Sequence, residues 1–270
     1  MANDRHNRPI GVFDSGIGGL TVVRELIKQL PGEDIVYFGD TARVPYGTKS
    51  KSLIIRFSKE NTQVLLRHHV KMVVVACNSS SSHALTSLRK SFSIPIVGVI
   101  HPGAKQAKAL TKNGRVGVIA TTATINSGAY ERELLKLSPR MKVFSKACPL
   151  FVPLVEEGWT NHAVTREVAK EYLGQMKKFK GDTLILGCTH YPLLKGVLQK
   201  VLGPKVALVD SAQSVAAEVR QLLQEKNLSR KKKRKAKYLF LISDESRHFR
   251  TQASRFLNFD ISKDIRVHHV

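Results

Sequence analysis

Two cysteines stand where apolar runs of strand length give way to polar, turn-forming residues. Cys77 ends the apolar run of VVVACNSS, and Cys188 ends that of LILGCTHY. A thiol takes up and releases a proton near neutrality, and its pKa falls beside helix N-termini or cationic groups. The sequence therefore offers two acid–base groups in matching settings.

The two cysteine segments belong to a larger internal repeat. IGVFDSG at 10–16 and VGVIATT at 116–122 also pair an apolar run with a small polar end, so that Ser15 and Thr121 lie 106 positions apart. Cys77 and Cys188 lie 111 positions apart. Inversion of an amino acid at its α-carbon needs a base on one face and a proton donor on the other. Two related halves with one thiol each would supply both.

Each thiol has a polar residue that could tune it. Asp14 ends the first apolar run in the half that holds Cys77, and His190 follows Cys188 by two positions. The alternative is that both cysteines are small buried hydrophobic residues, the usual environment of a free cysteine. The Asn-Ser and Thr-His that follow them favour chemistry. Cys148, in KACPLFVPLVEEG, has no such setting, and we expect it in the core.

Apolar segments of strand length alternate with amphipathic segments of helix length, a pattern typical of an α/β fold with mainly parallel sheets. We expect strands near residues 10–13, 34–38, 71–76, 95–99, 115–119, 141–145, 183–187, 205–209 and 237–242. Helices should fall between them, among them residues 20–30, 50–69 and 211–226. Ser211 is the N-cap candidate of the last helix.

With 270 residues, 42% of them hydrophobic, the chain can form two modest cores. We expect two pseudo-symmetric domains, each a mainly parallel sheet flanked by helices. Residues 1–98 with 211–270 form the first domain, which holds Cys77, and residues 99–210 form the second, which holds Cys188. Ligands of open α/β sheets sit beyond the carboxyl ends of the strands. The active site should therefore lie in the cleft between the domains.

The glycines of DSGIGGL invite a nucleotide-binding interpretation, but Thr21 stands where a dinucleotide fingerprint has its last glycine. No phosphate-binding G-x-x-x-x-G-K-[ST] motif occurs either. The segment predicts a tight turn whose backbone N–H groups and following helix N-terminus face an anion, and we favour a carboxylate.

The composition narrows the class of protein. No apolar stretch approaches the roughly 20 residues of a membrane span, and MANDRHNRP lacks the apolar region of a secretory signal. Three cysteines do not suggest a disulfide framework, so we expect a soluble cytoplasmic protein with free thiols. The net charge is +23, and RKKKRKAK at 230–237 concentrates seven basic residues in eight positions. This block is expected to be a solvated loop, with weak, salt-dependent nucleic-acid binding as the alternative.

Six blocks in order carry a resemblance: DSGIGGLTVVREL, YFGDTARVPYG, VVVACNSSS, GVIATTATINSGAYE, CPLFVPLVEEG and GCTHYPLL. From about residue 10 to about 220 the chain resembles the glutamate racemases of the aspartate/glutamate racemase superfamily. The resemblance implies interconversion of L- and D-glutamate without cofactor or metal, supplying D-glutamate for peptidoglycan. It also implies that the protein forms a homodimer, binds the small-molecule substrate glutamate and does not associate with a membrane.

The resemblance assigns roles residue by residue. It makes Cys77 the thiolate that deprotonates D-glutamate and Cys188 the one that deprotonates L-glutamate, with help from Asp14 and His190. Two further acidic residues, Asp40 and Glu156, match positions implicated in catalysis. Positions that hold the ammonium and carboxylates of the substrate match Ser15, Pro45, Tyr46, Gly47, Asn78, Ser79, Thr121, Thr124 and Thr189.

Two positions depart from the family pattern. Ser79 stands where a threonine is common, which predicts a looser substrate contact, and His101 stands where an acidic residue is common. If His101 faces the crevice or the domain hinge, affinity or regulation should be atypical. Three rival functions stay open: an aspartate or related racemase with the same thiols, a nucleic-acid or acidic-partner binding protein acting through 230–237, and a thiol hydrolase. A hydrolase would leave the second matched cysteine unexplained.

Overall fold

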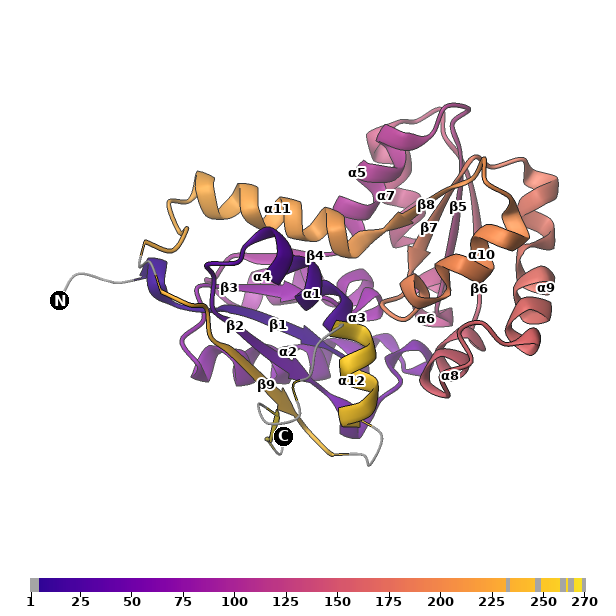
Figure 1. Ribbon diagram of the computed structural model, residues 1–270. Coiled ribbons are helices and arrows are strands. Elements are labelled where there is room, and N and C mark those ends of the chain that lie inside the picture. Colours follow the sequence, from indigo (N-terminus) through magenta and orange to yellow (C-terminus); the bar gives the residue numbers. More distant parts are fainter. Residues whose placement is uncertain (1–4, 232–233, 246–248, 258–260, 262–264, 269–270) are drawn as a thin grey trace.

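Two parallel sheets, each flanked by helices, make up the computed structural model, which describes residues 5–231, 234–245, 249–257, 261 and 265–268 (Figure 1). The first sheet has the order β10-β9-β2-β1-β3-β4 and the second the order β6-β5-β7-β8, with every neighbouring pair parallel. The strands of the first sheet are β1 (Ile10–Asp14), β2 (Ile35–Gly39), β3 (Met72–Val75), β4 (Ile96–Gly98), β9 (Tyr238–Ile242) and β10 (Ile265–Val267). Those of the second are β5 (Arg115–Ala120), β6 (Lys142–Ala147), β7 (Thr183–Gly187) and β8 (Ala207–Asp210). The predicted α/β class is confirmed.

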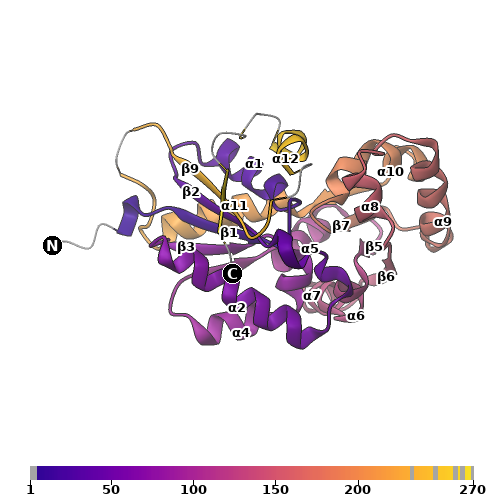
Figure 2. The same ribbon diagram turned by 90° about the horizontal axis from the view of Figure 1, so that it is seen from below.

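Helices cover the faces of both sheets (Figure 1, Figure 2). The α-helices are α1 (Leu20–Gln29), α2 (Lys51–Arg67), α3 (Asn78–His83), α4 (Leu85–Ser91), α5 (Ile100–Leu110), α6 (Thr122–Asn126), α7 (Ala129–Leu137), α8 (Phe151–Glu156), α9 (Ala163–Phe179), α10 (Lys195–Leu202), α11 (Ser211–Glu225) and α12 (Phe249–Leu257). Short 3-10 turns are η1 (Arg5–Asn7), η2 (Thr41–Arg43), η3 (Tyr46–Thr48) and η4 (Tyr191–Leu194). Within the described ranges, no helix has both the length and the apolar character to cross a membrane.

Burial on both faces explains the strand sequences. Every residue of β1, β2, β3 and β7 is buried, as expected of parallel strands covered by helices on each side. Their side chains therefore form continuous apolar runs with no polar alternation. The nine strands expected from those runs are all present, each end within two residues of its expected place.

Three features differ from or add to the expectation. The N-cap prediction for α11 is wrong, because Asp210 and not Ser211 accepts the bond from the backbone N of Ala212, at 3.0 Å. Asp210 is also the last residue of β8, so the helix follows the strand directly, and a carboxylate makes a strong cap. The strand β10 and the helix α12 were not expected.

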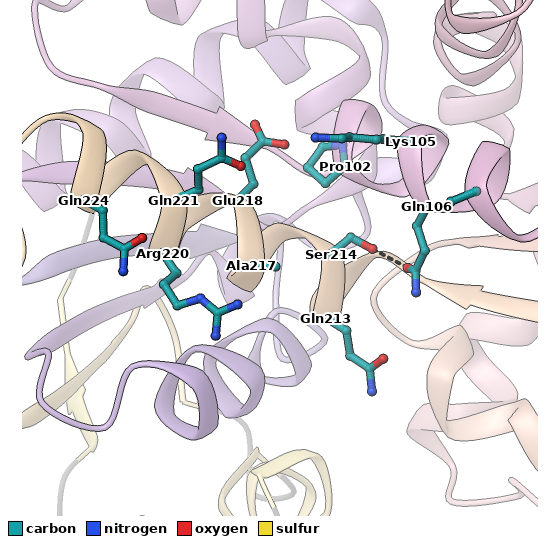
Figure 3. Close-up of a pocket in the computed structure, with 11 residues that line it drawn as sticks. Pro102, Lys105, Gln106, Gln213, Ser214, Ala217, Glu218, Arg220, Gln221 and Gln224 are labelled. Carbon is teal, nitrogen blue, oxygen red and sulfur yellow. Dashed lines mark hydrogen bonds between the residues drawn. The ribbon is translucent and has the colours of Figure 1, made fainter.

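The chain crosses between the sheets at two places, from β4 into α5 and from β8 into α11. The two sheets draw their strands from the ranges expected for the two domains, although the exact domain boundaries remain a prediction. The crossing helices α5 and α11 pack on each other, and Ser214 donates a hydrogen bond to Oε1 of Gln106 across their contact (Figure 3). A groove of about 530 Å³ runs between these helices, and among the described residues no thiol or histidine lines it.

Candidate active site

Both candidate thiols line one small cavity between the two sheets. Cys77 follows β3 and precedes α3, while Cys188 follows β7 in the other sheet. The cavity has a volume of about 30 Å³. Its lining residues are Ser15, Val44, Pro45, Tyr46, Gly47, Cys77, Asn78, Ser79, Thr121, Val152, Cys188, Thr189 and His190. The carboxyl ends of parallel strands from both sheets thus meet here.

Most of the residues selected from the sequence line this cavity, but four do not. Asp14, Asp40, Glu156 and Thr124 are absent from its lining and lie behind residues that form it. The sequence gave no sign of the two valines of the lining, Val44 and Val152, which are ordinary apolar residues in their segments. These two valines give the cavity an apolar part beside its polar lining.

Cys77 lies in a buried, negatively charged setting. It is 5% exposed, and its Sγ donates to Oγ of Ser15 at 3.6 Å. Burial and then the nearby charge of Asp14 raise the pKa of the Cys77 thiol to about 11. Near neutral pH this thiol therefore carries its proton.

Asp14 is fully buried behind Cys77. Its Oδ2 accepts from the backbone N of Gly16 at 3.1 Å, and its Oδ1 has no hydrogen-bond partner among the described residues. Burial raises the pKa of Asp14, while the charge of His190 and the backbone N–H groups of the turn act to lower it. The carboxylate that the DSGIGGL turn faces is therefore one of the protein's own.

Cys188 lies beside a buried histidine. Its Sγ is 3.8 Å from Nδ1 of His190, whose Nε2 is 3.0 Å from Oε1 of Glu156. Burial acts to lower the pKa of His190, but the hydrogen bonds and charges of Cys188 and Glu156 prevail and raise it to about 10. A protonated imidazole at this position stabilises negative charge on the neighbouring sulfur. The two thiols thus have opposite electrostatic surroundings.

The helix α12 holds the histidine from the other domain. The ring of Phe256 meets that of His190 edge to face, with centroids 5.6 Å apart and planes at 82°. Nε2 of Gln252 donates to the backbone O of Glu156 at 2.5 Å, and Nη1 of Arg24 in α1 donates to the backbone O of Phe256 at 3.1 Å. Neither Gln252 nor Phe256 was expected at the site, because the positions of both residues depend on how the C-terminal segment packs.

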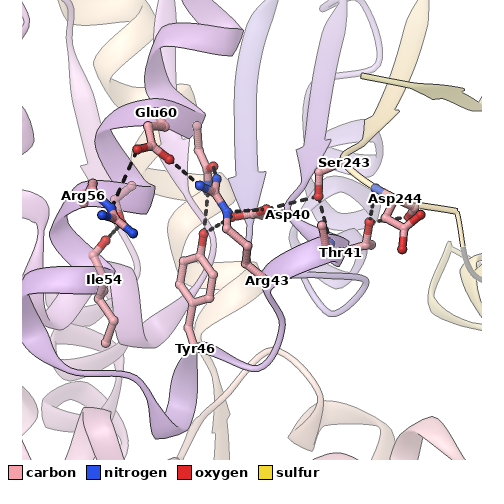
Figure 4. A network of polar contacts seen from close by, with 12 residues as sticks. Asp40, Thr41, Arg43, Tyr46, Ile54, Arg56, Glu60, Ser243 and Asp244 are labelled. Atoms are coloured by element: carbon pink, nitrogen blue, oxygen red, sulfur yellow. Dashed lines mark hydrogen bonds and ion pairs between the residues drawn. The ribbon is translucent and has the colours of Figure 1, made fainter. Parts of the chain in front are cut away.

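Asp40 belongs to a network of polar contacts that includes Tyr46, a residue of the cavity lining (Figure 4). It is fully buried and accepts from Nε of Arg43 at 2.7 Å, from Oγ of Ser243 at 3.1 Å and from the hydroxyl of Tyr46. Nδ2 of Asn61 donates to the same Tyr46 hydroxyl at 3.1 Å. Asp40 therefore fixes Tyr46 and does not itself reach the cavity.

A cluster of hydroxyl groups joins the two domains at the cavity. Oγ of Ser79 lies 3.0 Å from Oγ1 of Thr121 and 3.3 Å from Oγ1 of Thr124. Thr121 also caps α6. A Cβ atom added to Gly47 would lie 2.7 Å from Cβ of Thr121, so this wall tolerates only a glycine at its closest approach.

Asn78 presents an unused donor at the cavity. Its Oδ1 accepts from the hydroxyl of Tyr130 at 2.7 Å, which fixes the orientation of the amide. Its Nδ2 is buried, and no acceptor for it lies among the described residues. A buried amide without a partner is costly unless a ligand supplies the acceptor.

The structure also locates Cys148 and His101, for which the sequence led to separate expectations. Cys148 is fully buried in the hydrophobic core, which confirms its expected place, and burial raises the pKa of its thiol. His101 lies near the start of α5, directly after the chain crosses between sheets, and outside the thiol cavity. Its Nδ1 is 2.6 Å from Oε1 of Glu133 in α7. The departure of His101 from the acidic residue that is common in the family therefore lies at the connection between domains.

Comparisons with known proteins find a matching family, curated relatives and solved structures of similar fold. The profile of the Asp/Glu/hydantoin racemase family matches residues 10–219. A curated glutamate racemase of Geobacter metallireducens is 49% identical over 250 residues, which cover 93% of each chain. The solved glutamate racemase RacE1 of Bacillus anthracis superposes with a TM-score of 0.92 at 40% identity, covering 98% of both chains. That of Francisella tularensis, in complex with D-glutamate, superposes with a TM-score of 0.91 at 40% identity, also covering 98% of both.

Proposed function

The chain belongs to the Asp/Glu/hydantoin racemase family and racemises glutamate, and we propose that Cys77 and Cys188 are the two groups that move the α-proton. It is an isomerase. The observation that carries the assignment is that the two thiols, one after a strand of each sheet, line the same cavity. A substrate bound there has one sulfur available to each face of its α-carbon.

In the direction from L to D, the thiolate of Cys188 takes the α-proton of L-glutamate. The electron pair of the broken C–H bond stays on the α-carbon and spreads into the adjacent carboxylate. Cys77 then gives its proton to the opposite face, which forms D-glutamate and leaves Cys77 as the thiolate. From D to L, Cys77 is the base and Cys188 the acid.

The electrostatics support this division of roles. Because the pKa of Cys77 is about 11, this thiol holds its proton until the carbanion forms. The protonated His190 stabilises the thiolate form of Cys188, and Glu156 holds the histidine ring in place. We therefore assign Cys188 as the base toward L-glutamate and Cys77 as the acid of the same direction.

Neutral donors suit a substrate with two carboxylates, since they bind charge without burying an unpaired cation. We assign substrate contacts to the hydroxyls of Ser15, Ser79, Thr121 and Thr189 and to the unused Nδ2 of Asn78. Thr124 acts through Ser79, and Asp40 acts through Tyr46. Tyr46 with its neighbours Pro45 and Gly47 shapes one wall.

Substrate binding requires the sheets to separate. A volume of about 30 Å³ holds about one water molecule, whereas glutamate has ten non-hydrogen atoms. We assign the movement to the two crossings at residues 98–100 and 210–211, because these are the places where the chain passes between sheets. Closure around the bound substrate then excludes water from the carbanion.

Three further proposals rest on the family alone. The working form is a homodimer, the compartment is the reducing cytoplasm that keeps the catalytic thiols free, and the product D-glutamate enters peptidoglycan. Sequence similarity to glutamate racemases over most of the chain supports all three.

The direct test is incubation of the purified protein with L-glutamate in deuterated water without added cofactor. We expect the α-proton signal and the optical rotation to disappear at comparable initial rates. Running L-aspartate in parallel tests the alternative substrate. Faster turnover of aspartate, or turnover that requires an added cofactor, would overturn the proposal.

A further inference from the structure

A second, basic cavity lies at the amino-terminal edge of the first sheet, far from the thiols. Its volume is about 740 Å³. Its position follows from three lining residues that precede strands: Arg8 lies just before β1, Lys71 directly before β3 and Pro95 directly before β4. The thiol cavity uses the carboxyl ends of strands, so the two sites occupy opposite edges.

The lining of this cavity is strongly positive. Its cationic and titratable members are Arg5, Arg8, His69, Lys71 and Lys226, and among the described residues no aspartate or glutamate lines it. Part of this charge has a structural role: Lys71 is buried and forms an ion pair with Glu33. Arg5, Arg8 and Lys226 are exposed. Basic residues are ordinary near helix C-termini, such as those of α2 and α11 here, but that effect does not account for a lining without any carboxylate.

The basic block at 230–237 continues this surface. Nζ of Lys71 donates to the backbone O of Leu228 at 2.9 Å, which ties the segment to the cavity, and Leu228 itself lines it. Further along, Arg234 pairs with Asp34 directly before β2, and the backbone O of Lys237 accepts from the N of Ile35. The described residues of the block therefore lie along the same edge of the sheet. Residues 232 and 233 of the block lie outside the described residues.

Together the cavity and the described residues of the block form a band of cations along one edge, which we call the basic edge. Two acidic residues pair with cations within it: Glu33 with Lys71, and Asp34 with both Arg230 and Arg234. The exposed basic residues on its described part include Arg5, Arg8, Lys226, Lys231, Lys235 and Lys237. Such a band attracts a ligand with many regularly spaced negative charges.

We propose that the basic edge binds double-stranded nucleic acid through its phosphates, independently of racemisation. A protein partner fits less well, because interface cores are apolar and aromatic. The exposed large apolar residues of the described chain lie elsewhere, at Leu110, Leu135, Leu150, Trp159, Val164 and Val267. A single strand fits less well too, since the block has no interleaved aromatic residues on which bases could stack.

The test compares two variants of equal net charge. The edge variant neutralises four exposed cations of the basic edge: Arg8→Gln, Lys226→Gln, Lys231→Gln and Lys235→Gln. The control neutralises four exposed lysines of the second domain: Lys108→Gln, Lys142→Gln, Lys177→Gln and Lys178→Gln. Affinity for a labelled 20-base-pair DNA is measured by fluorescence anisotropy at several salt concentrations, and racemisation is assayed as a check of folding.

Each phosphate contact contributes about 0.9 to the slope of log affinity against log salt, so four lost contacts lower the slope by about 3.6. Between 50 and 200 mM salt, the wild type should therefore lose roughly a hundredfold more affinity than the edge variant. The control should bind DNA as the wild type does, and both variants should racemise glutamate normally.

Three results would overturn the proposal. Equal loss of DNA affinity in both variants would mean that only the net charge matters. Unchanged affinity in the edge variant would place binding elsewhere. Inorganic polyphosphate and polyglutamate, added as competitors of the labelled DNA, test whether the edge binds another polyanion. Tighter binding of either than of DNA would assign the edge to that ligand instead.

Discussion

Replacing Glu156 by glutamine should lower the pH above which kcat/KM for racemisation declines, the alkaline limit, without abolishing racemisation. Glu156 is 3.0 Å from Nε2 of His190, and together with Cys188 it raises the pKa of that histidine to about 10. An unperturbed histidine has a pKa of about 6.5. The variant keeps a hydrogen-bonding group of the same shape and removes only the charge.

The size of the effect follows from how exposed Glu156 is. Its side chain is 35% exposed, so solvent screens its charge, and we assign it about one pH unit of the increase, equivalent to about 1.4 kcal/mol. A raised histidine pKa means that the imidazolium is present at lower pH and is lost as pH rises through that value. The limit in the variant should therefore fall from about pH 10 to about pH 9.

The assay is kcat/KM across the range from pH 7 to pH 11. The variant should match the wild type near pH 8 and be about fivefold slower at pH 10, since the protonated fraction of His190 falls from about one half to about one tenth. Because enantiomers have equal free energies, the loss must be the same from either enantiomer. The exposed neighbour Glu157 provides the matched control, Glu157→Gln, with no expected change. A uniform loss at every pH, or no loss at pH 10, would refute the role given to Glu156.

Three further substitutions test other parts of the site. Gly18→Ala would bring a methyl group within 2.6 Å of Nδ1 of His190, so kcat/KM should fall at least about tenfold, and normal kinetics would show that the contact is not tight. Asp40→Ala should lower the free energy of unfolding by about 3 kcal/mol and the Tm by about 6–10 °C in calorimetry, because the Tyr46 hydroxyl and the Arg43 guanidinium both lose Asp40 as acceptor. An unchanged Tm would contradict this. Phe256→Leu should remove an aromatic contact worth about 1 kcal/mol, lowering kcat about fivefold with KM little changed, whereas an effect on KM alone would place the ring at the substrate.

The sequence predicted the fold well because its information is local. Runs such as VVVAC are buried on both faces, so each strand is evident from its own residues. The two cysteines were found for the same reason, since each ends such a run. Ser211 was mistaken for a helix cap because the sequence does not reveal that Asp210 serves both the strand and the helix.

What could not be predicted depends on contacts between distant segments. Asp14 ends β1 and Asp40 directly follows β2, yet Asp40 lies outside the cavity lining and is bonded to Ser243 from the far end of the chain. Phe256 and Gln252 reach His190 and Glu156 only because the C-terminal helix packs beside α1. Their segment has no motif that marks it.

The most direct test of the two-thiol assignment is deuterium exchange by single-thiol variants, followed separately for each enantiomer. Neither Cys77→Ala nor Cys188→Ala should racemise glutamate, and both should keep the circular dichroism of the wild type. In deuterated water Cys77→Ala should exchange the α-proton of L-glutamate only, and Cys188→Ala that of D-glutamate only, because each keeps the base of one face. Racemisation by either variant, or exchange of the opposite enantiomer, would contradict the assignment.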